Sequence, residues 1–381
     1  MPVRVEVAPA LLAWAGERSG HDRDNLERRF PKLADWELGE LFPTLRQLEH
    51  FAHATHTPIG YFFLDNPPVD RLPVPDFRTI GSGSVATPSP NLLDTIALCE
   101  QRQEWYRDFA RSGGEDPIGF VGSLTISTSI EEAARRIRST LDFEPEMRRQ
   151  LPTWTASLRR LSENAEEAGV LVMVSGVVGS NTRRKLDPQE FRGFALVDEF
   201  APLVFINGSD TKAAQIFTLA HELVHIWLGQ SAVSNPMLAG AERNNIERWC
   251  NGVAADLLVP LESLRRDFDP DTKLTGELSR LARLFKVSTL VVLRRIHDAG
   301  FLPWAAFRAA YAEEQHRLLD IADTSGGNFH NTQPVRVSKR FARAIIESTL
   351  EGNTLHRDAF RLLGLSKFST FEEIGRRLGV A

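Results

Sequence analysis

Two histidines at helical spacing, His221 and His225, enclose a glutamate at position 222. Residues four apart lie one turn from each other on the same face of an α-helix, so both imidazoles can bind one ion. Glu222 can reach a metal-bound water but is not aligned to be a third ligand. The pattern predicts a Zn²⁺ site in which the metal lowers the pKa of its water to about 7 and Glu222 takes the proton. The same carboxyl can then protonate a leaving amine.

A catalytic zinc site also needs a third protein ligand and one open position. The segment 246–260 offers Glu247, while Glu242, Cys250 and Asp256 compete with it. Spacing alone favours Glu247 and leaves the other three open.

The predicted elements around the motif suit such a site. We expect a helix over 211–228 that ends at Gly229, because turn and capping residues precede it and glycine is the usual residue after a helix. Its other face is apolar, with Ile216, Leu219, Leu223, Ile226 and Trp227. Short apolar runs at 170–174, 191–197 and 203–206 predict strands. The last two suggest a hairpin around 191–206, whose edge we expect to align a peptide by main-chain hydrogen bonds.

The rest of the chain has mostly helical patterns, and Gly81-Ser82-Gly83-Ser84 indicates a loop or linker. The expected fold is α+β and mostly helical, with a zincin-like core and a small β-sheet between helical N- and C-terminal domains. Predicted helices cover 8–18, 22–30, 44–55, 91–111, 129–140, 153–168, 241–258, 274–285 and 289–298, with two or three short ones in 338–380.

Composition narrows the class of protein. A chain of 381 residues suggests two or three domains. A net charge of −5 gives no global attraction to nucleic acid, and no apolar run approaches the roughly 18 residues that span a bilayer. The start of the chain lacks the apolar core of a signal peptide. Cys99 and Cys250 cannot form a disulfide framework, which indicates a reducing compartment and hence the cytoplasm.

The run Phe217–His225, followed by Glu247 to Asn251 and Ala254 to Pro260, resembles the ImmA/IrrE family of bacterial and phage metallopeptidases. The resemblance covers about residues 160–265. In that family the glutamate four before the asparagine is the third zinc ligand, which implies Glu247 here. It also implies a regulatory endopeptidase whose protein substrate is an Xre-type repressor or a toxin–antitoxin partner.

The N-terminal block has a second resemblance. Trp36 to Glu40 followed by Pro43 to Leu48 is similar to the end of the third helix and the start of the fourth in Xre-type helix-turn-helix domains. Only 30–35 lies between the second helix and Trp36, so the recognition helix should be short or broken. Residues 1–66 hold 7 Lys+Arg against 10 Asp+Glu. Because phosphate contacts drive affinity for DNA, protein docking or repressor mimicry is favoured over DNA binding.

The tail resembles a C-terminal region of longer ImmA/IrrE proteins, through Gly326 to Phe329, Ser338 to Arg343 and Arg357 to Gly364. Those forms often sit beside a PIN-like toxin gene. The alternative to a peptidase is therefore a non-proteolytic regulatory module, either the antitoxin of a PIN-like toxin pair or a DNA-binding regulator, with sensory or structural zinc. A basic cluster in the tail indicates either a solvated helix face or a surface for an acidic partner or nucleic acid; its members are Arg336, Lys339, Arg340 and Arg343.

We expect four regions. They are a degenerate helix-turn-helix domain at 1–66, a linker and helical connector at 67–160, a zincin-like metallopeptidase core at 161–265 and a helical C-terminal domain at 266–381.

Overall fold

The computed structural model describes residues 3–68, 72–76, 88–234, 245–321 and 336–380. Glu242 and the stretches 81–84 and 326–329, which the sequence analysis singled out, lie outside these residues. The chain divides into two compact units, residues 1–73 with 85–96 and residues 74–84 with 97–381. The division falls inside helix α5 (Pro90–Ser112), after Ile96.

The first unit is a group of short helices around an aromatic core. It contains α1 (Pro9–Arg18), α2 (Arg23–Arg29), α3 (Leu33–Glu37), α4 (Leu45–Ala54) and the 3-10 helix η1 (Ile59–Phe63). Trp36 and Phe51 are buried and meet edge to face, with ring centroids 6.3 Å apart. Thr44 and Gln47 cap α4 reciprocally, which explains why that helix begins there. The helix expected to be short or broken here is α3, which has five residues and contains Trp36, whereas a helix-turn-helix function for this unit stays a prediction.

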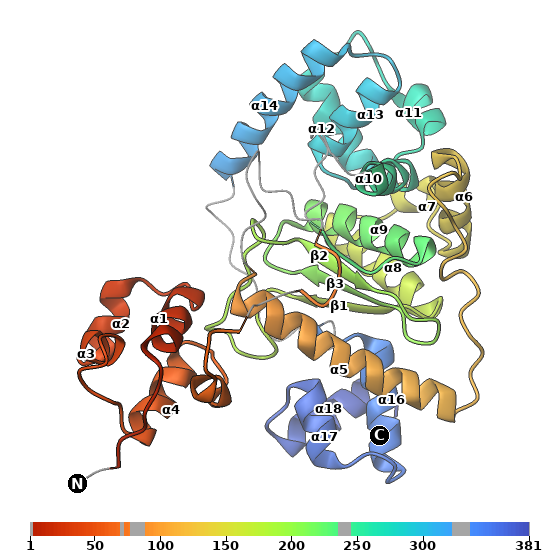
Figure 1. Cartoon of the computed structure of the whole chain (residues 1–381). Coiled ribbons are helices and arrows are strands. Elements are labelled where there is room, and N and C mark those ends of the chain that lie inside the picture. The colour runs from red at the N-terminus through yellow and green to blue at the C-terminus, as the bar shows by residue number, and fades with distance from the viewer. Residues whose placement is uncertain (1–2, 69–71, 77–87, 235–244, 322–335, 381) are drawn as a thin grey trace. The chain divides into compact units, whose positions relative to one another are not determined.

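A four-stranded mixed sheet forms the centre of the second unit (Figure 1). Its strands are β1 (Leu171–Ser175), β2 (Gly193–Leu196), β3 (Leu203–Asn207) and β4 (Ala232–Ser234), in the order β1-β3-β2-β4. β1 pairs with β3 in parallel, while β2 pairs antiparallel with β3 and with β4. The first three strands confirm the sequence prediction, including the hairpin. β4 was not predicted.

Both faces of the sheet are covered, so all residues of the four strands are buried. Val172, Val204 and Ile206 share a hydrophobic core with α9 (Lys212–Leu228) and α8 (Trp154–Glu167). On the other face, Met173 lies 3.9 Å from the Cys99 sulfur of α5. Burial on both faces explains why the strands are continuous apolar runs rather than alternating ones.

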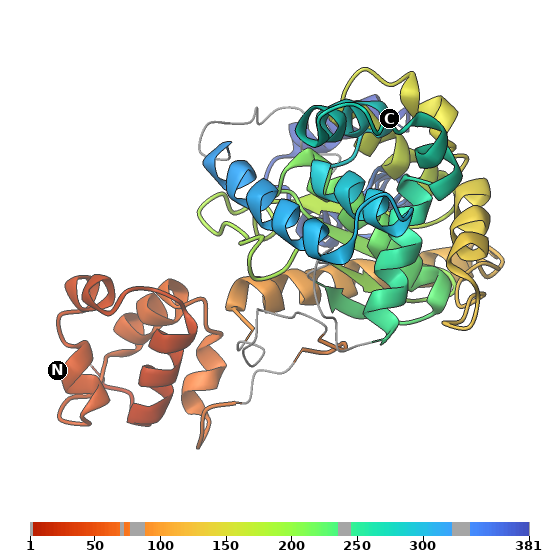
Figure 2. The same cartoon turned by 90° about the horizontal axis from the view of Figure 1, so that it is seen from above.

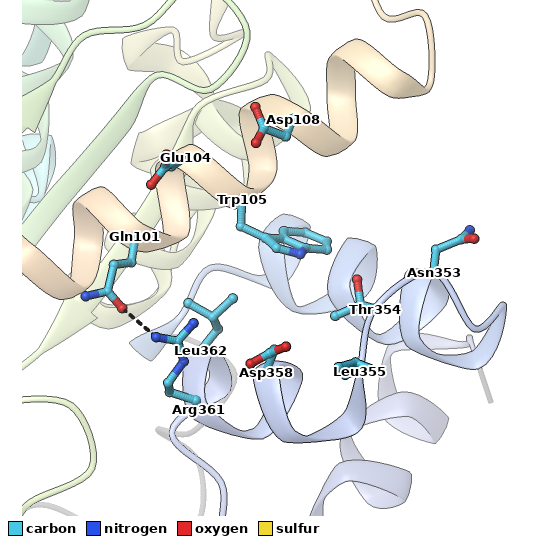
Figure 3. A pocket seen from close by; sticks show the side chains of 10 residues that line it. All are labelled: Gln101, Glu104, Trp105, Asp108, Asn353, Thr354, Leu355, Asp358, Arg361 and Leu362. Carbon is cyan, nitrogen blue, oxygen red and sulfur yellow. Dashed lines mark hydrogen bonds between the residues drawn. The ribbon is translucent and has the colours of Figure 1, made fainter.

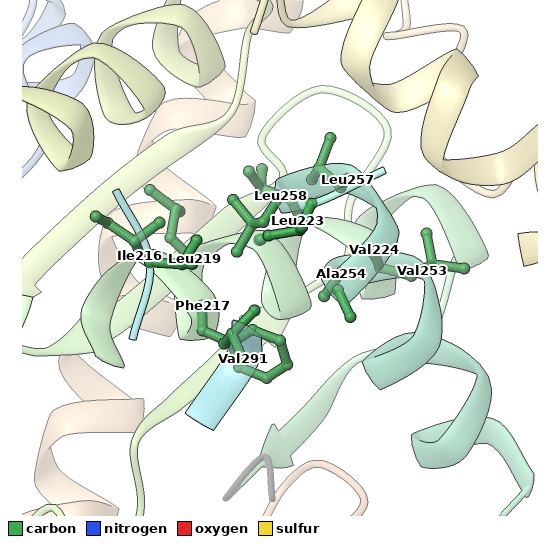
Figure 4. Close-up of a cluster of buried hydrophobic side chains, with 14 of the residues drawn as sticks. Ile216, Phe217, Leu219, Leu223, Val224, Val253, Ala254, Leu257, Leu258 and Val291 are labelled. Atoms are coloured by element: carbon green, nitrogen blue, oxygen red, sulfur yellow. The ribbon is translucent and has the colours of Figure 1, made fainter. Parts of the chain in front are cut away.

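Helix α9 lies between the sheet and a second layer of helices. Thr211 begins it, since the side chain accepts a hydrogen bond from the Ala214 N–H at 3.3 Å. Gly229 ends it in the left-handed region, with φ of 74°. Across α9 packs α10 (Asn245–Leu258), and the two helices meet through Val224, Val253 and other buried aliphatic side chains (Figure 4). The apolar rear face predicted for the 211–228 helix is therefore confirmed.

Helices make up most of the rest of the second unit, which confirms the expected mostly helical α+β fold. Figures 1 and 2 show α10 to α14 on the α9 side of the sheet. The remaining helices are α6 (Ile130–Thr140), α7 (Pro145–Arg149), α11 (Leu261–Asp267), α12 (Leu274–Phe285), α13 (Thr289–Asp298), α14 (Trp304–Ile321), α16 (Lys339–Leu350), α17 (His356–Leu363) and α18 (Phe368–Leu378). No helix in the described ranges is long and apolar enough to cross a bilayer.

Two residues of the basic cluster of the tail, Lys339 and Arg340, form ion pairs inside the molecule. Lys339 pairs with Glu163 of α8 at 2.8 Å. Arg340 donates to the Tyr106 hydroxyl at 2.7 Å and pairs with Glu115 at 3.3 Å. These residues thus attach α16 to α5 and α8, and the acidic partner that the sequence suggested belongs to the same chain.

A shallow pocket lies where α5 meets α17 (Figure 3). Arg361 donates to Gln101 across it at 3.4 Å. The remaining lining residues are Glu104, Trp105, Asp108, Asn353, Thr354, Leu355, Asp358 and Leu362.

Candidate metal centre

The two histidines of α9 lie one turn apart, as their spacing requires. Their ring centroids are 4.9 Å apart and their Nε2 atoms 3.1 Å apart. Both side chains are completely buried. Because the Nε2 atoms converge on one point, a single ion can reach both.

Glu247, in the first turn of α10, brings a carboxylate to the same point. Its Oε2 atom lies 3.3 Å from Nε2 of His221, and its Oε1 atom lies 3.1 Å from Nε2 of His225. These three residues form a group of potential metal ligands among the described residues. The close packing of α9 on α10 through small and branched side chains makes the approach possible.

The three donor atoms fit a zinc ion. Ligands held about 2.0–2.1 Å from a tetrahedral Zn²⁺ lie roughly 3.3–3.4 Å from each other. The 3.1–3.3 Å separations between the histidine nitrogens and the Glu247 oxygens are close to that value. Two histidines and one carboxylate, with a fourth position free, are also a donor set of catalytic zinc sites.

The electrostatics of the ligands suits metal binding. Burial lowers the pKa of His225 below its ordinary value, which favours the neutral imidazole. Burial alone would raise the pKa of Glu247, but the adjacent His221 and His225 lower it to about 2. Neutral imidazole and ionised carboxylate are the protonation states in which these side chains bind metals.

Glu222 lies beside the three ligands with a different environment. It is completely buried, and within the described part of the chain neither carboxyl oxygen has a hydrogen-bond partner. The pKa of Glu222 is raised to about 8, mainly by burial. His221 and the Ser234 hydroxyl lower this pKa, whereas the charge of Glu247 raises it. A carboxyl with this pKa can both accept and release a proton near neutral pH.

The sequence left three other candidates for the third ligand position: Cys250, Asp256 and Glu242. The Cys250 sulfur lies 4.0 Å from Nδ1 of His225, on the opposite side of the ring from Nε2. Asp256 lies at the far end of α10, where Arg295 donates to it and Arg138 lies 3.8 Å away. Glu242 is outside the described residues. Among the described candidates, Glu247 alone points at both Nε2 atoms.

The predicted peptide-binding edge of the hairpin around 191–206 is wrong. β3 is paired with β1 on its outer side, and β2 is paired with β4. Each hairpin strand therefore has a neighbour on both sides, and its backbone groups are used in the sheet. The strand beyond β2 at the edge of the sheet is β4, which the sequence analysis missed.

The sequence analysis did not identify Gly193 and Ser234 as functional candidates, although both lie near the site. A Cβ atom on Gly193 would lie 2.6 Å from Thr218 Cγ2 and 3.0 Å from the Glu222 carboxyl. Gly193 pairs with Ser234 in the sheet, so both lie next to Glu222. The available signal was the glycine itself, because a glycine inside a strand often marks a close approach of another element.

Two segments of the chain match known families. Residues 165–297 match a peptidase family model described as the IrrE N-terminal-like domain. Residues 337–377 match a domain of unknown function, DUF8813. No curated protein matches the chain. The four strands and helices α9 and α10 lie within the first segment, so this part of the chain, with His221, Glu222, His225 and Glu247, is similar to the IrrE-type peptidases and supports the ImmA/IrrE resemblance.

Proposed function

We propose that the chain is a regulatory zinc-dependent endopeptidase. The observation that carries the proposal is the convergence of His221, His225 and Glu247, with inter-donor distances of 3.1–3.3 Å, next to a buried carboxyl without a hydrogen-bond partner in the described residues. The match of residues 165–297 to a peptidase family supports it.

Each residue has a separate role in this proposal. His221, His225 and Glu247 hold Zn²⁺, which when bound supplies a Lewis acid that polarises a scissile carbonyl and makes water more acidic. Glu222 accepts the proton of the attacking water at a carboxyl oxygen and returns it to the leaving amine. The raised pKa of Glu222, about 8, suits the second of these transfers. Gly193 leaves room for that carboxyl between the sheet and α9.

The substrate we propose is a protein, either an Xre-type repressor or a toxin–antitoxin partner, as the resemblance to ImmA/IrrE proteins implies. The first unit would select it by protein contact rather than by DNA binding, because residues 1–66 are acidic. Cys99 and Cys250 are both buried thiols, which agrees with the reducing cytoplasm we propose as the location.

The Glu222→Gln variant tests the proposal. It keeps all three metal ligands, so it should retain about one zinc per chain, as wild type should. Cleavage should fall by about 10²–10⁴-fold, the usual contribution of a general base. The readout is intact mass of a co-expressed repressor or neighbouring gene product, with Glu199→Gln, an exposed glutamate between β2 and β3, as the matched control.

The outcomes separate the two functions. If Glu222→Gln processes the partner as fast as wild type, the peptidase proposal fails. If wild type neutralises a toxin that stays intact, the non-proteolytic antitoxin gains instead.

A further inference from the structure

The outer edge of β4 already holds an extended piece of the same chain. The Val233 N–H points away from β2 and donates to the Pro75 carbonyl at 3.0 Å. Asp76 and Val233 form a parallel β-bridge. Residues 75–76 therefore begin to add a strand to the sheet, in the manner by which a sheet edge binds an extended peptide.

This edge is the one nearest the proposed catalytic carboxyl. The sheet order β1-β3-β2-β4 leaves two outer strands, β1 and β4, and α9 packs on the two inner strands, β3 and β2. Ser234, the neighbour of Val233, pairs with Gly193, whose Cα lies against Glu222. An extended chain paired with Val233 therefore lies next to Ser234, whose partner Gly193 contacts Glu222.

The centre itself is closed in this arrangement. His221, Glu222 and His225 are 0% exposed and Glu247 is 6% exposed. A substrate carbonyl cannot reach side chains buried to this extent, so some part of the molecule must move before a peptide enters. Residues 75–76 contact the sheet edge through a single β-bridge, whereas the strands and α9 belong to the core.

We propose that the outer edge of β4 is the docking edge for an extended substrate, and that Pro75 and Asp76 occupy it as an internal inhibitor which the substrate must displace. This inference rests on the proposed peptidase function. The segment directly follows Pro73, where the first unit ends, so the first unit has a covalent connection to the inhibitory contact.

A disulfide that fixes the segment tests the displacement. Asp76 and Val233 are bridge partners, and partners on adjacent strands have the Cα separation that a disulfide needs. With purified proteins, the reduced Asp76→Cys/Val233→Cys double variant should cleave a repressor or the neighbouring gene product. When oxidised it should cleave at least about tenfold more slowly. The single variants, oxidised in the same way, control for lost Val233 packing and for oxidation of Cys99 or Cys250.

Hydrogen exchange tests the occupancy without catalysis. The Val233 amide should be protected in the wild-type protein, and more strongly in the oxidised double variant. A Val233 amide that exchanges as fast as an unstructured one overturns the occupancy, whatever the activity. Equal cleavage by the oxidised and reduced double variant overturns the displacement alone. Absence of cleavage by zinc-loaded wild type overturns the peptidase function itself, and the inhibitor role with it.

Discussion

The two ends of α10 hold buried carboxylates in opposite settings. Glu247 lies in the first turn, where the helix dipole favours an anion, and faces two histidines. Asp256 lies near the last turn, where the dipole disfavours an anion, and faces Arg295 and Arg138. Both arginines also bind backbone carbonyls at this end, Arg295 that of Val259 and Arg138 that of Asp256.

The difference lies in what neutralises each charge. Arginine is always charged in proteins, so Asp256 has a permanent counter-charge inside the chain. Burial lowers the pKa of His225, so that histidine gives Glu247 no permanent positive charge. A buried carboxylate without a permanent counter-charge is stabilised by a divalent cation, whereas one between arginines already forms a closed structural pair. The same helix thus carries a candidate metal ligand at one end and a structural ion pair at the other.

The Glu247→Gln variant should have the largest effect on metal binding. A neutral amide replaces the anionic ligand, so zinc affinity should fall by more than the 10–100-fold typical of losing an outer-shell partner. Cleavage should be lost with it, because the site no longer holds zinc. Zinc per chain after dialysis against a graded chelator measures the affinity. Glu262→Gln, an exposed acid on α11, is the control, and full zinc retention by Glu247→Gln would remove this residue from the ligand set.

The Arg295→Met variant should have the opposite pattern. It leaves Asp256 with Arg138 at 3.8 Å, and breaking a buried pair typically destabilises by about 3–5 kcal/mol. Folded molecules should still bind about one zinc. Urea unfolding measures the loss, and Arg294→Met, whose side chain is 33% exposed and pairs with Asp298, should lose less than about 1 kcal/mol. Equal losses of unfolding free energy in the two variants would mean that the Asp256–Arg295 pair stabilises the fold no more than the Arg294–Asp298 pair.

The histidine pair that faces Glu247 was predictable from the sequence, and the arginine end of α10 was not. The four-residue spacing of His221 and His225, with glycine after the helix, is a local pattern that determines both a helix and a shared face. Asp256 and Arg295 lie 39 positions apart, and nothing local relates them. The sequence therefore left Asp256 open as a ligand, and only the packing of α13 against the end of α10 assigns it to the ion pair.

Strand β4 and the tail show the same limit. Ala232–Ser234 is three residues long, too short for a period-two pattern, and its pairing with β2 is a tertiary contact. The missing strand led to the wrong peptide-binding edge. Likewise, Lys339 and Arg340 formed a basic pattern whose acidic partners, Glu163 and Glu115, lie more than 170 positions away in the chain. Patterns of charge identify a surface, but the fold decides whether another molecule or the same chain covers it.

The Gly193→Ala variant, which should have a smaller effect, tests how closely β2 packs against Glu222. The added Cβ would meet Thr218 Cγ2 at 2.6 Å and the Phe205 carbonyl at 2.9 Å, and overpacking of this kind typically destabilises by about 1–3 kcal/mol. Cleavage should fall because Glu222 must shift. Gly119→Ala, where a Cβ meets nothing within 4 Å, should be nearly neutral. Adding Thr218→Ala should recover part of the stability, and a Gly193→Ala protein with unchanged stability and cleavage would contradict the close packing.

The smallest effect concerns a third partly buried acid, Glu166, which lies at neither end of α10. Burial raises its pKa to about 6, although Ser338 and the backbone N–H groups of Lys339 and Arg340 lower it. The folded state therefore binds this proton more tightly than the unfolded state. The resulting stabilisation is complete below about pH 4.5 and is lost as the pH rises through 6. Glu166→Gln should thus be more stable than wild type above pH 6, by at most about 2 kcal/mol, and should lose that advantage near pH 4.5.

Urea unfolding of both proteins at pH 4.5, 6 and 7.5 measures that difference. The amide oxygen of the Glu166→Gln variant can still accept from the Lys339 N–H, as the wild-type carboxyl does at 2.8 Å, so the hydrogen bond is kept and only the charge is removed. An advantage that is constant with pH would mean that the proton on Glu166 plays no part. An acid without a full counter-charge inside the chain titrates at an accessible pH, so the pH dependence of Glu166→Gln extends the contrast between the two ends of α10 to the attachment of α16.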